Sequence, residues 1–169
     1  MTLEIRRLTP DDADALFAVR VRALATDPVA FTAEQSQEEA LGVPFFRERL
    51  GQPLDQAATF GAWEDGALVG MVGLFRPDRP KGWHKVMVWG MWVAPEARQH
   101  GVGRGLLAAA LAFARAMPDC ARVKLSVNTG QLAAVRLYQS MGFEVTGTEP
   151  DALRWEGVSY DEHHMERVL

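Results

Sequence analysis

The chain has a single cysteine, no long apolar run and no excess of basic residues. Because Cys120 is the only cysteine among 169 residues, an internal disulfide is excluded. No apolar run reaches the ~20 residues of a membrane-spanning helix, and the first residues lack the apolar core of a signal peptide. Lysine and arginine total 18 against 22 acidic residues, and no basic stripe indicates nucleic-acid binding. These absences favour a cytoplasmic protein that binds neither membranes nor nucleic acids.

The length and the apolar pattern predict one domain over residues 1–169. Hydrophobic residues make up 48% of the chain, enough for a substantial core. Alternating and helical periodicities predict seven strands and four helices. The strands are expected at 2–8, 57–63, 68–75, 85–93, 122–128, 143–147 and 159–168. The helices are expected at 10–25, at 31–50 with a break near Gly42 and Pro44, from the glycine-rich loop to Met117, and at 131–141. The apolar run 85–93 is expected to be covered on both faces.

The most informative segment is a basic, glycine-rich loop between the strand ending at Val93 and the following helix. It contains Arg98, His100 and Arg104, interleaved with Gly101 and Gly103. Glycines let backbone N–H groups approach a bulky anion, and a helix N-terminus adds free donors and partial positive charge. The pattern favours a phosphate or pyrophosphate ligand, although a loop that merely begins a helix is the alternative.

Two familiar phosphate-binding loops do not match this segment. The lysine and hydroxyl pair of a P-loop is missing, and Leu106 occupies the third glycine position of a dinucleotide-binding fingerprint. Seven residues also separate Val93 from Gly101, which is too long for the first turn of a dinucleotide-binding fold. What remains is the pattern Arg-x-x-Gly-x-Gly, formed by Arg98, Gly101 and Gly103.

A second segment narrows the interpretation. A predicted strand, Arg122–Asn128, precedes a short helix that ends at Gly142, and the stretch Ala134, Leu137, Tyr138, Gly142 and Phe143 follows the loop by about 30 residues. In this order and spacing the two segments resemble the Gcn5-related N-acetyltransferase (GNAT) superfamily over nearly the full chain. The resemblance implies an α/β (α+β) fold: a mixed, mostly antiparallel seven-stranded sheet with helices on both faces and splayed fourth and fifth strands.

The same resemblance implies a site for acetyl-CoA as cosubstrate and no metal. In the family, the fourth strand pairs with pantetheine, the loop wraps the pyrophosphate, and a tyrosine points at the sulfur. A bulge at Gly90 and core packing of Trp89 are expected beside that site. The cofactor-binding residues carried over are Met91, Val93, Arg98, Gln99, His100, Gly101, Val102, Gly103, Arg104, Tyr138 and either Gln131 or Asn128.

The implied reaction is direct attack of a primary amine on acetyl-CoA in a ternary complex. A lysine-like amine has a pKa of about 10.4, so its neutral form costs about 4–5 kcal/mol at neutral pH. The Met91 N–H would stabilise the oxyanion, and Tyr138 would protonate the departing thiolate. Relatives place a base where this chain has Met87 or Ser126, so no general base is assigned. His84 or a chain of waters is a candidate.

The acceptor is not identified by the sequence. Elements that line the acceptor side in relatives contribute Phe31, Glu34, Glu38, Glu39, Phe45, Phe46, Arg154, Trp155 and Tyr160. Acidic residues there would attract a cationic amine, or they form a solvated helix face, whereas Arg154 would suit a substrate carboxylate. Adjacent His163 and His164 point to opposite faces of a strand, which argues against a metal site with Glu162.

The sequence is therefore compatible with three classes of function. The leading one is an N-acetyltransferase acting on a small molecule or a protein. The others are a non-catalytic acyl-CoA-binding sensor with the same fold and a nucleotide-binding module of another type. The resemblance also makes a homodimer plausible.

Overall fold

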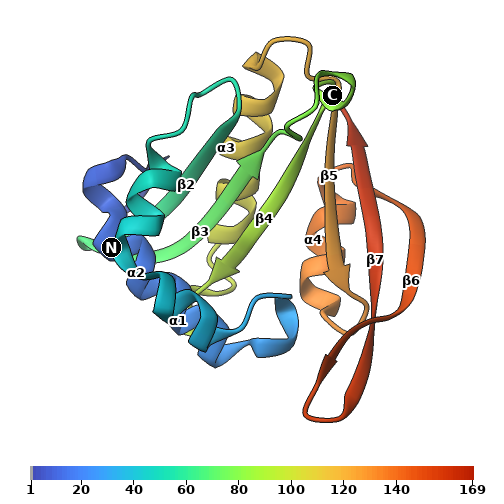
Figure 1. Cartoon of the computed structure of the whole chain (residues 1–169), viewed down its shortest axis with the longest axis horizontal. Helices are drawn as coiled ribbons and strands as arrows, with labels where there is room; N and C mark the ends of the chain where they lie inside the picture. The colour runs from blue at the N-terminus through green and yellow to red at the C-terminus, as the bar shows by residue number, and fades with distance from the viewer. Residues whose placement is uncertain (1) are drawn as a thin grey trace.

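The computed structural model describes residues 2–169, whose seven strands form one mixed sheet (Figure 1). The strand order is β1-β2-β3-β4-β5-β7-β6, and every neighbouring pair is antiparallel except β4 and β5. The strands are β1 (Leu3–Arg7), β2 (Ala57–Glu64), β3 (Ala67–Phe75), β4 (Lys85–Val93), β5 (Arg122–Asn128), β6 (Glu144–Trp155) and β7 (Val158–Val168). This arrangement confirms the predicted sheet.

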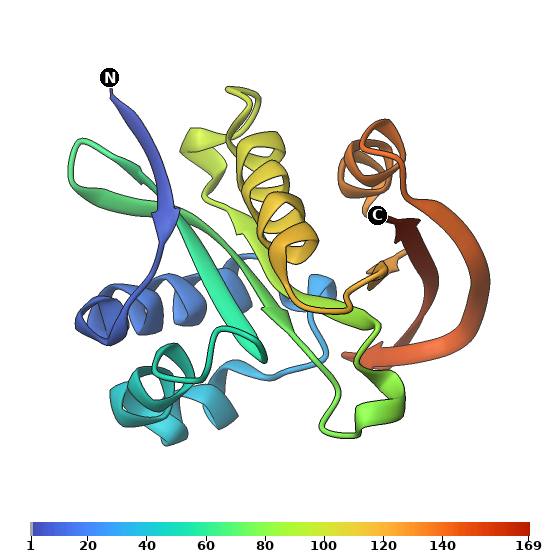
Figure 2. The same cartoon turned by 90° about the horizontal axis from the view of Figure 1, so that it is seen from above.

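Helices cover both faces of the sheet. Figure 2 shows α1 (Ala13–Thr26) and α2 (Gln35–Leu50) on one side, and α3 (Val102–Ala116) and α4 (Leu132–Ser140) on the other. The predicted apolar face of α3 is buried against the sheet: Leu106, Leu107, Ala110, Leu111 and Ala114. The predicted break in the second helix is confirmed at Gly42, which has a φ of +67° within α2.

Tight turns connect both hairpins. Asp65 and Gly66 both have positive φ between β2 and β3, as a two-residue type I′ turn requires and as is typical of an Asp-Gly pair. Glu156 and Gly157 repeat this geometry between β6 and β7. The prediction that the sixth strand ends near Gly147 is therefore wrong, because this turn extends the pairing as far as Trp155 and Val158.

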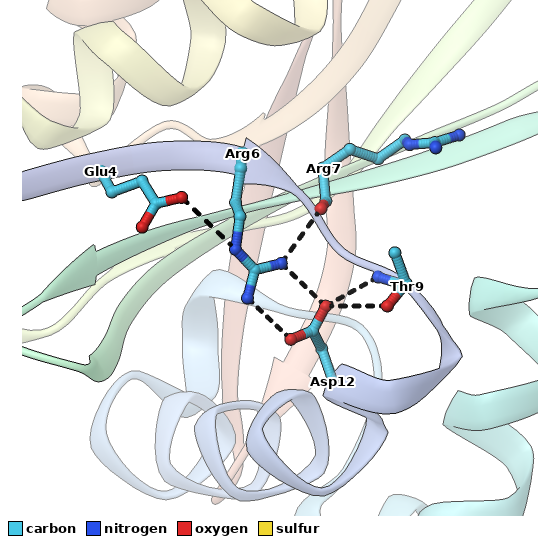
Figure 3. A network of polar contacts seen from close by, with 5 residues as sticks. All are labelled: Glu4, Arg6, Arg7, Thr9 and Asp12. Atoms are coloured by element: carbon cyan, nitrogen blue, oxygen red, sulfur yellow. Dashed lines mark hydrogen bonds and ion pairs between the residues drawn. The ribbon is translucent and has the colours of Figure 1, made fainter.

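A charged network joins β1 to the start of α1 (Figure 3). The Arg6 guanidinium donates to both Asp12 oxygens, from Nη1 to Oδ2 at 2.9 Å and from Nη2 to Oδ1 at 2.8 Å. The Thr9 N–H donates to Asp12 Oδ2 at 2.8 Å, which closes a capping box. The Arg6 hydrogen bonds are the main reason that the pKa of Asp12 falls to about 2.

The two parallel strands separate soon after they meet. β4 and β5 pair only from Lys85 to Met87 and from Arg122 to Lys124, and beyond these residues they diverge (Figure 1). No residue of β4 is exposed, in agreement with the expectation that 85–93 is covered on both faces, but only Val86 and Trp92 are fully buried. Divergence from β5 opens one edge of β4 to the space between the strands.

Candidate active site

The space between the diverging strands is a cavity of about 540 Å³. Cavities of this size are typical of small-molecule sites. Its walls come from β4, the loop before α3, the start of α3, β5, α4 and the segment that connects α1 to α2. Ten of the twelve sequence-predicted cofactor residues line it: Met91, Val93, Arg98, Gln99, Gly101, Val102, Gly103, Arg104, Gln131 and Tyr138.

A bulge shapes the β4 wall. Trp89 and Trp92 of β4 pair with Gly73 and Met71 of β3, so β4 has one more residue than β3 between these two pairs. Within this stretch Gly90 has a φ of +64°. This confirms the bulge predicted at Gly90. In the pairing recorded for residues 2–169, Met91 has no partner in β3 or in β5. Its backbone groups can therefore bond to a ligand in the cavity.

The three loop glycines are needed for different reasons. Gly101 precedes α3 with a φ of +78°, a conformation that disfavours side chains. A Cβ on Gly103 would lie 3.2 Å from Leu137 Cδ2 and 3.4 Å from Met91 Cε, so this position faces the cavity floor. A Cβ on Gly105 would overlap Ile5, so this glycine lets α3 pack against β1.

The start of α3 offers backbone donors. The first α-helical bond at this end runs from the Gly105 N–H to the Gly101 carbonyl at 2.9 Å. The N–H groups of Val102, Gly103 and Arg104 come before it and have no acceptor one helical turn back within the helix. These donors, with the partial positive charge of the helix end, can bind a phosphate or diphosphate.

Asp27 holds this loop to the rest of the site. Its Oδ2 accepts hydrogen bonds from Arg98 Nη2 and from Trp92 Nε1, both at 2.7 Å. Arg98 Nε also donates to the Val93 carbonyl at 2.9 Å. The Arg98 guanidinium thus fixes the loop against β4, which leaves the backbone amides as the principal donors to a ligand. Sequence reasoning missed Asp27 because its partners lie far along the chain.

Tyr138 lies on the opposite wall from β4, on α4. The residue is only 5% exposed, and its ring packs edge-on against Phe143 with centroids 5.8 Å apart. Burial raises the pKa of the Tyr138 hydroxyl above its ordinary value, so the phenol is neutral and can donate a proton.

Two predicted cofactor residues lie elsewhere. Among residues 2–169, the cavity lining does not include His100 or Asn128. The Asn128 amide donates to the Val29 carbonyl at 3.0 Å and accepts from the Gly130 N–H at 2.8 Å. It therefore anchors the segment between α1 and α2 to the end of β5, whereas Gln131 lines the cavity.

A buried ion pair lies behind the acceptor side. Arg20 donates to Glu38 from Nε at 2.7 Å and from Nη2 at 2.9 Å, while Arg20 Nη1 is buried with no partner among the described residues. Arg49 stacks on the Trp89 ring at 3.6 Å, and burial lowers its pKa. Trp89 thus lines the cavity while its ring is held by the Arg49 guanidinium. Since Glu38 is neutralised by Arg20, it does not offer a free carboxylate to a cationic acceptor.

The other acceptor-side residues have mixed placements. Phe31 lines the cavity, whereas Phe46 is a fully buried core residue packed against Phe45. Glu34 and Glu39 are exposed, and Arg154 pairs with Asp151 on its own hairpin. The candidate base His84 is exposed and lies outside the cavity lining, as far as residues 2–169 are concerned.

Neither a cluster of metal-ligating side chains nor a membrane-spanning helix is present among the described residues. No group of three or more metal-ligating side chains lies close enough, within residues 2–169, to hold a metal ion. Over the same residues, no helix has the length and apolarity needed to cross a membrane.

Comparison with known proteins identifies the family. The model of the acetyltransferase (GNAT) family matches residues 21–143, which include β4, the glycine-rich loop, α3, β5 and α4. The chain belongs to this family.

Relatives of known sequence and structure agree with this assignment. A mycothiol acetyltransferase from Salinispora tropica is 34% identical over 145 residues, which are 85% of this chain and 44% of that protein. Human N-acetyltransferase 8 is 40% identical over 81 residues, 47% of this chain and 35% of that protein. The chain thus spans less than half the length of these curated relatives.

Solved structures match over nearly the whole chain. A GNAT acetyltransferase from Streptococcus pneumoniae has a TM-score of 0.85 at 26% identity, covering 99% of this chain and all of that one. A phosphinothricin acetyltransferase from Sinorhizobium meliloti, solved with acetyl-CoA, has a TM-score of 0.83 at 20% identity and covers 100% of this chain and 89% of that one. The latter shows the common fold.

Proposed function

We propose that the protein transfers an acetyl group from acetyl-CoA to a primary amine of a small molecule or a protein. The observation that carries this proposal is the cavity itself. Free amides at the start of α3, the unpaired bulge of β4 and Tyr138 of α4 all face one space. Family membership supports the same activity.

The binding part follows from the backbone. A diphosphate would lie against the amides from Arg98 to Arg104, and the pantetheine arm would pair with the open edge of β4 at Met91 and Val93. The residues fit this cosubstrate because Gly103 keeps the floor of the cavity clear where a side chain would crowd Leu137 and Met91.

The chemical part uses two groups on opposite walls. As the amine attacks, charge develops on the thioester oxygen, and the Met91 N–H would stabilise it by roughly 3 kcal/mol. The C–S bond then breaks and Tyr138 gives its proton to the CoA thiolate. Burial raises the phenol pKa, but a thiolate in the same desolvated space also has a raised pKa, so the transfer stays feasible.

Thiol release from acetyl-CoA, measured with a panel of alkylamines, amino acids and lysine peptides, tests this function. Wild type should turn over at least one class, and Tyr138→Phe should lower kcat roughly 10²-fold with little change in the Kd for CoA. Binding of CoA without turnover of any amine would instead support the non-catalytic sensor. ATP or NAD competing as well as CoA would point to a different nucleotide-binding module.

Three further features belong to this proposal. We expect residues 1–169 to form one domain. We also expect the protein to be cytoplasmic and to form a homodimer. Light scattering gives the oligomeric state, and fractionation of the cells that make the protein gives the location.

A further inference from the structure

Three polar side chains from three strands form a hydrogen-bonded chain beside the cavity. Ser126 Oγ lies 2.9 Å from His164 Nδ1, and His164 Nε2 lies 3.1 Å from Glu149 Oε2. Ser126 is on β5, His164 on β7 and Glu149 on β6, and the register places Ser126 directly opposite His164. Ser126 also lines the cavity, so one end of this series of hydrogen bonds reaches the space where the acceptor would bind.

The partners determine which way protons can move. A carboxylate only accepts, so Glu149 favours the tautomer with the proton on Nε2 of His164. Nδ1 then carries the lone pair and accepts the Ser126 hydroxyl proton. The His164 side chain is 43% exposed, so a proton received there can pass to water.

We propose that Ser126 and His164 form the relay that removes the proton from the acceptor ammonium, with Glu149 as the positioning residue. This inference rests on the proposed acetyl transfer. The ammonium gives one proton to Ser126 Oγ while the Ser126 proton passes to His164 Nδ1, and His164 later releases it to solvent. The neutral amine attacks the thioester carbon, the C–N bond forms and the C–S bond breaks. The second proton of the nitrogen passes to Tyr138, which has given its own proton to the CoA thiolate, so Tyr138 returns to its starting state.

The charges around His164 suit a transient imidazolium. The charged groups on its face are Glu144 and Glu149 from β6, Glu162 and Glu166 from β7, and Arg122 and Lys124 from β5. Glu166 is paired with Arg122 and Lys124. Burial and the neighbouring Glu149 raise the pKa of Glu162. Acidic groups therefore outnumber basic ones on this face, and they would attract a positive charge passing through the ring.

The neighbouring histidine provides a matched control. His163 is on the same strand, but its Nδ1 contacts Thr148 Oγ1 at 2.8 Å and it belongs to the opposite face. His164→Gln and His163→Gln remove the same ring from adjacent positions. Only the first should interrupt the relay.

The test compares both variants with wild type, using the alkylamine of the panel with the highest turnover. His164→Gln should lower kcat/KM roughly 10²-fold at pH 7, with an unchanged Kd for CoA, whereas His163→Gln should stay within about twofold. Wild-type kcat/KM should depend less steeply on pH than that of His164→Gln, because only wild type can accept the proton of the ammonium form. The His164→Gln rate should keep rising in proportion to the free amine. Glu149→Gln should reduce kcat without changing the Kd for CoA.

Two results separate the possible failures. If wild type is active and both glutamine variants match it, or if both lose activity equally, the relay is wrong while acetyl transfer stands. If wild type binds CoA and acetylates no amine, the proposed function itself fails and the relay fails with it.

Discussion

A negative charge placed at Gly103 should separate binding of the cofactor from stability of the fold. Gly103 is the second residue of α3, and a Cβ there would lie 3.2 Å from Leu137 Cδ2 and 3.4 Å from Met91 Cε. Asparagine and aspartate have nearly the same shape, so Gly103→Asn measures the steric effect and Gly103→Asp adds only charge. The comparison of these two variants isolates electrostatics at the proposed diphosphate site.

The size of the charge effect follows from Coulomb's law. At about 5 Å and an effective dielectric constant of about 20, one carboxylate repels one phosphate charge by roughly 3 kcal/mol, equal to about 10²- to 10³-fold in Kd. Calorimetry at low salt should therefore give a Kd for CoA at least ~10²-fold weaker for Gly103→Asp than for Gly103→Asn. The ratio should shrink with added salt, since the screening length falls from about 10 Å at 0.1 M to about 3 Å at 1 M.

The stability of the fold should not fall with the affinity for CoA when aspartate replaces asparagine at position 103. An acid in the first turn of a helix is favourable by roughly 0.3–1 kcal/mol, so Gly103→Asp should melt at or above the Tm of Gly103→Asn. Weak CoA binding in a well-folded aspartate variant would locate the diphosphate at this helix end. Equal affinity of the two variants for CoA would refute the assignment of the loop.

Two further substitutions test the charged networks. The pKa of Asp12 lies at about 2 in the folded chain, below its ordinary 3.8, so its contribution is complete above the ordinary value and is lost as the pH falls through about 2. Asp12→Asn should lower the free energy of unfolding by about 1 kcal/mol at pH 6, a small value because the partly exposed Arg6 is screened by water. Near pH 2 the same substitution should have almost no effect, as measured by urea titrations at both pH values. An equal loss at both would disprove the ionic origin. Glu38→Gln should cost about 3–5 kcal/mol because the Arg20 side chain, 6% exposed, loses its paired charge. Differential calorimetry would measure this cost, Glu39→Gln at the exposed neighbouring position is the control, and equal Tm values for the two variants would contradict a structural role for the buried pair.

Sequence alone was sufficient wherever a feature depends on neighbouring residues. The Asp65–Gly66 turn, the break at Gly42 and the glycine cap at Gly142 follow from backbone preferences that act over a few positions. The glycines of the loop and the start of α3 are also contiguous in the sequence. The proposed diphosphate site can therefore be recognised from the sequence alone. The turn of the long β6–β7 hairpin, at Glu156 and Gly157, also depends only on neighbouring residues.

Only the tertiary structure decided which distant residues meet. Asp27 reaches Trp92 and Arg98 across more than sixty residues of sequence, and Ser126 meets His164 only because β5 pairs with β7 in one particular register. A shift of one residue would turn the histidine to the other face. Register and strand divergence result from packing of the whole sheet, so no local pattern predicts them. Local chemistry therefore determined where a diphosphate could bind, whereas long-range pairing determined which side chains could move the protons.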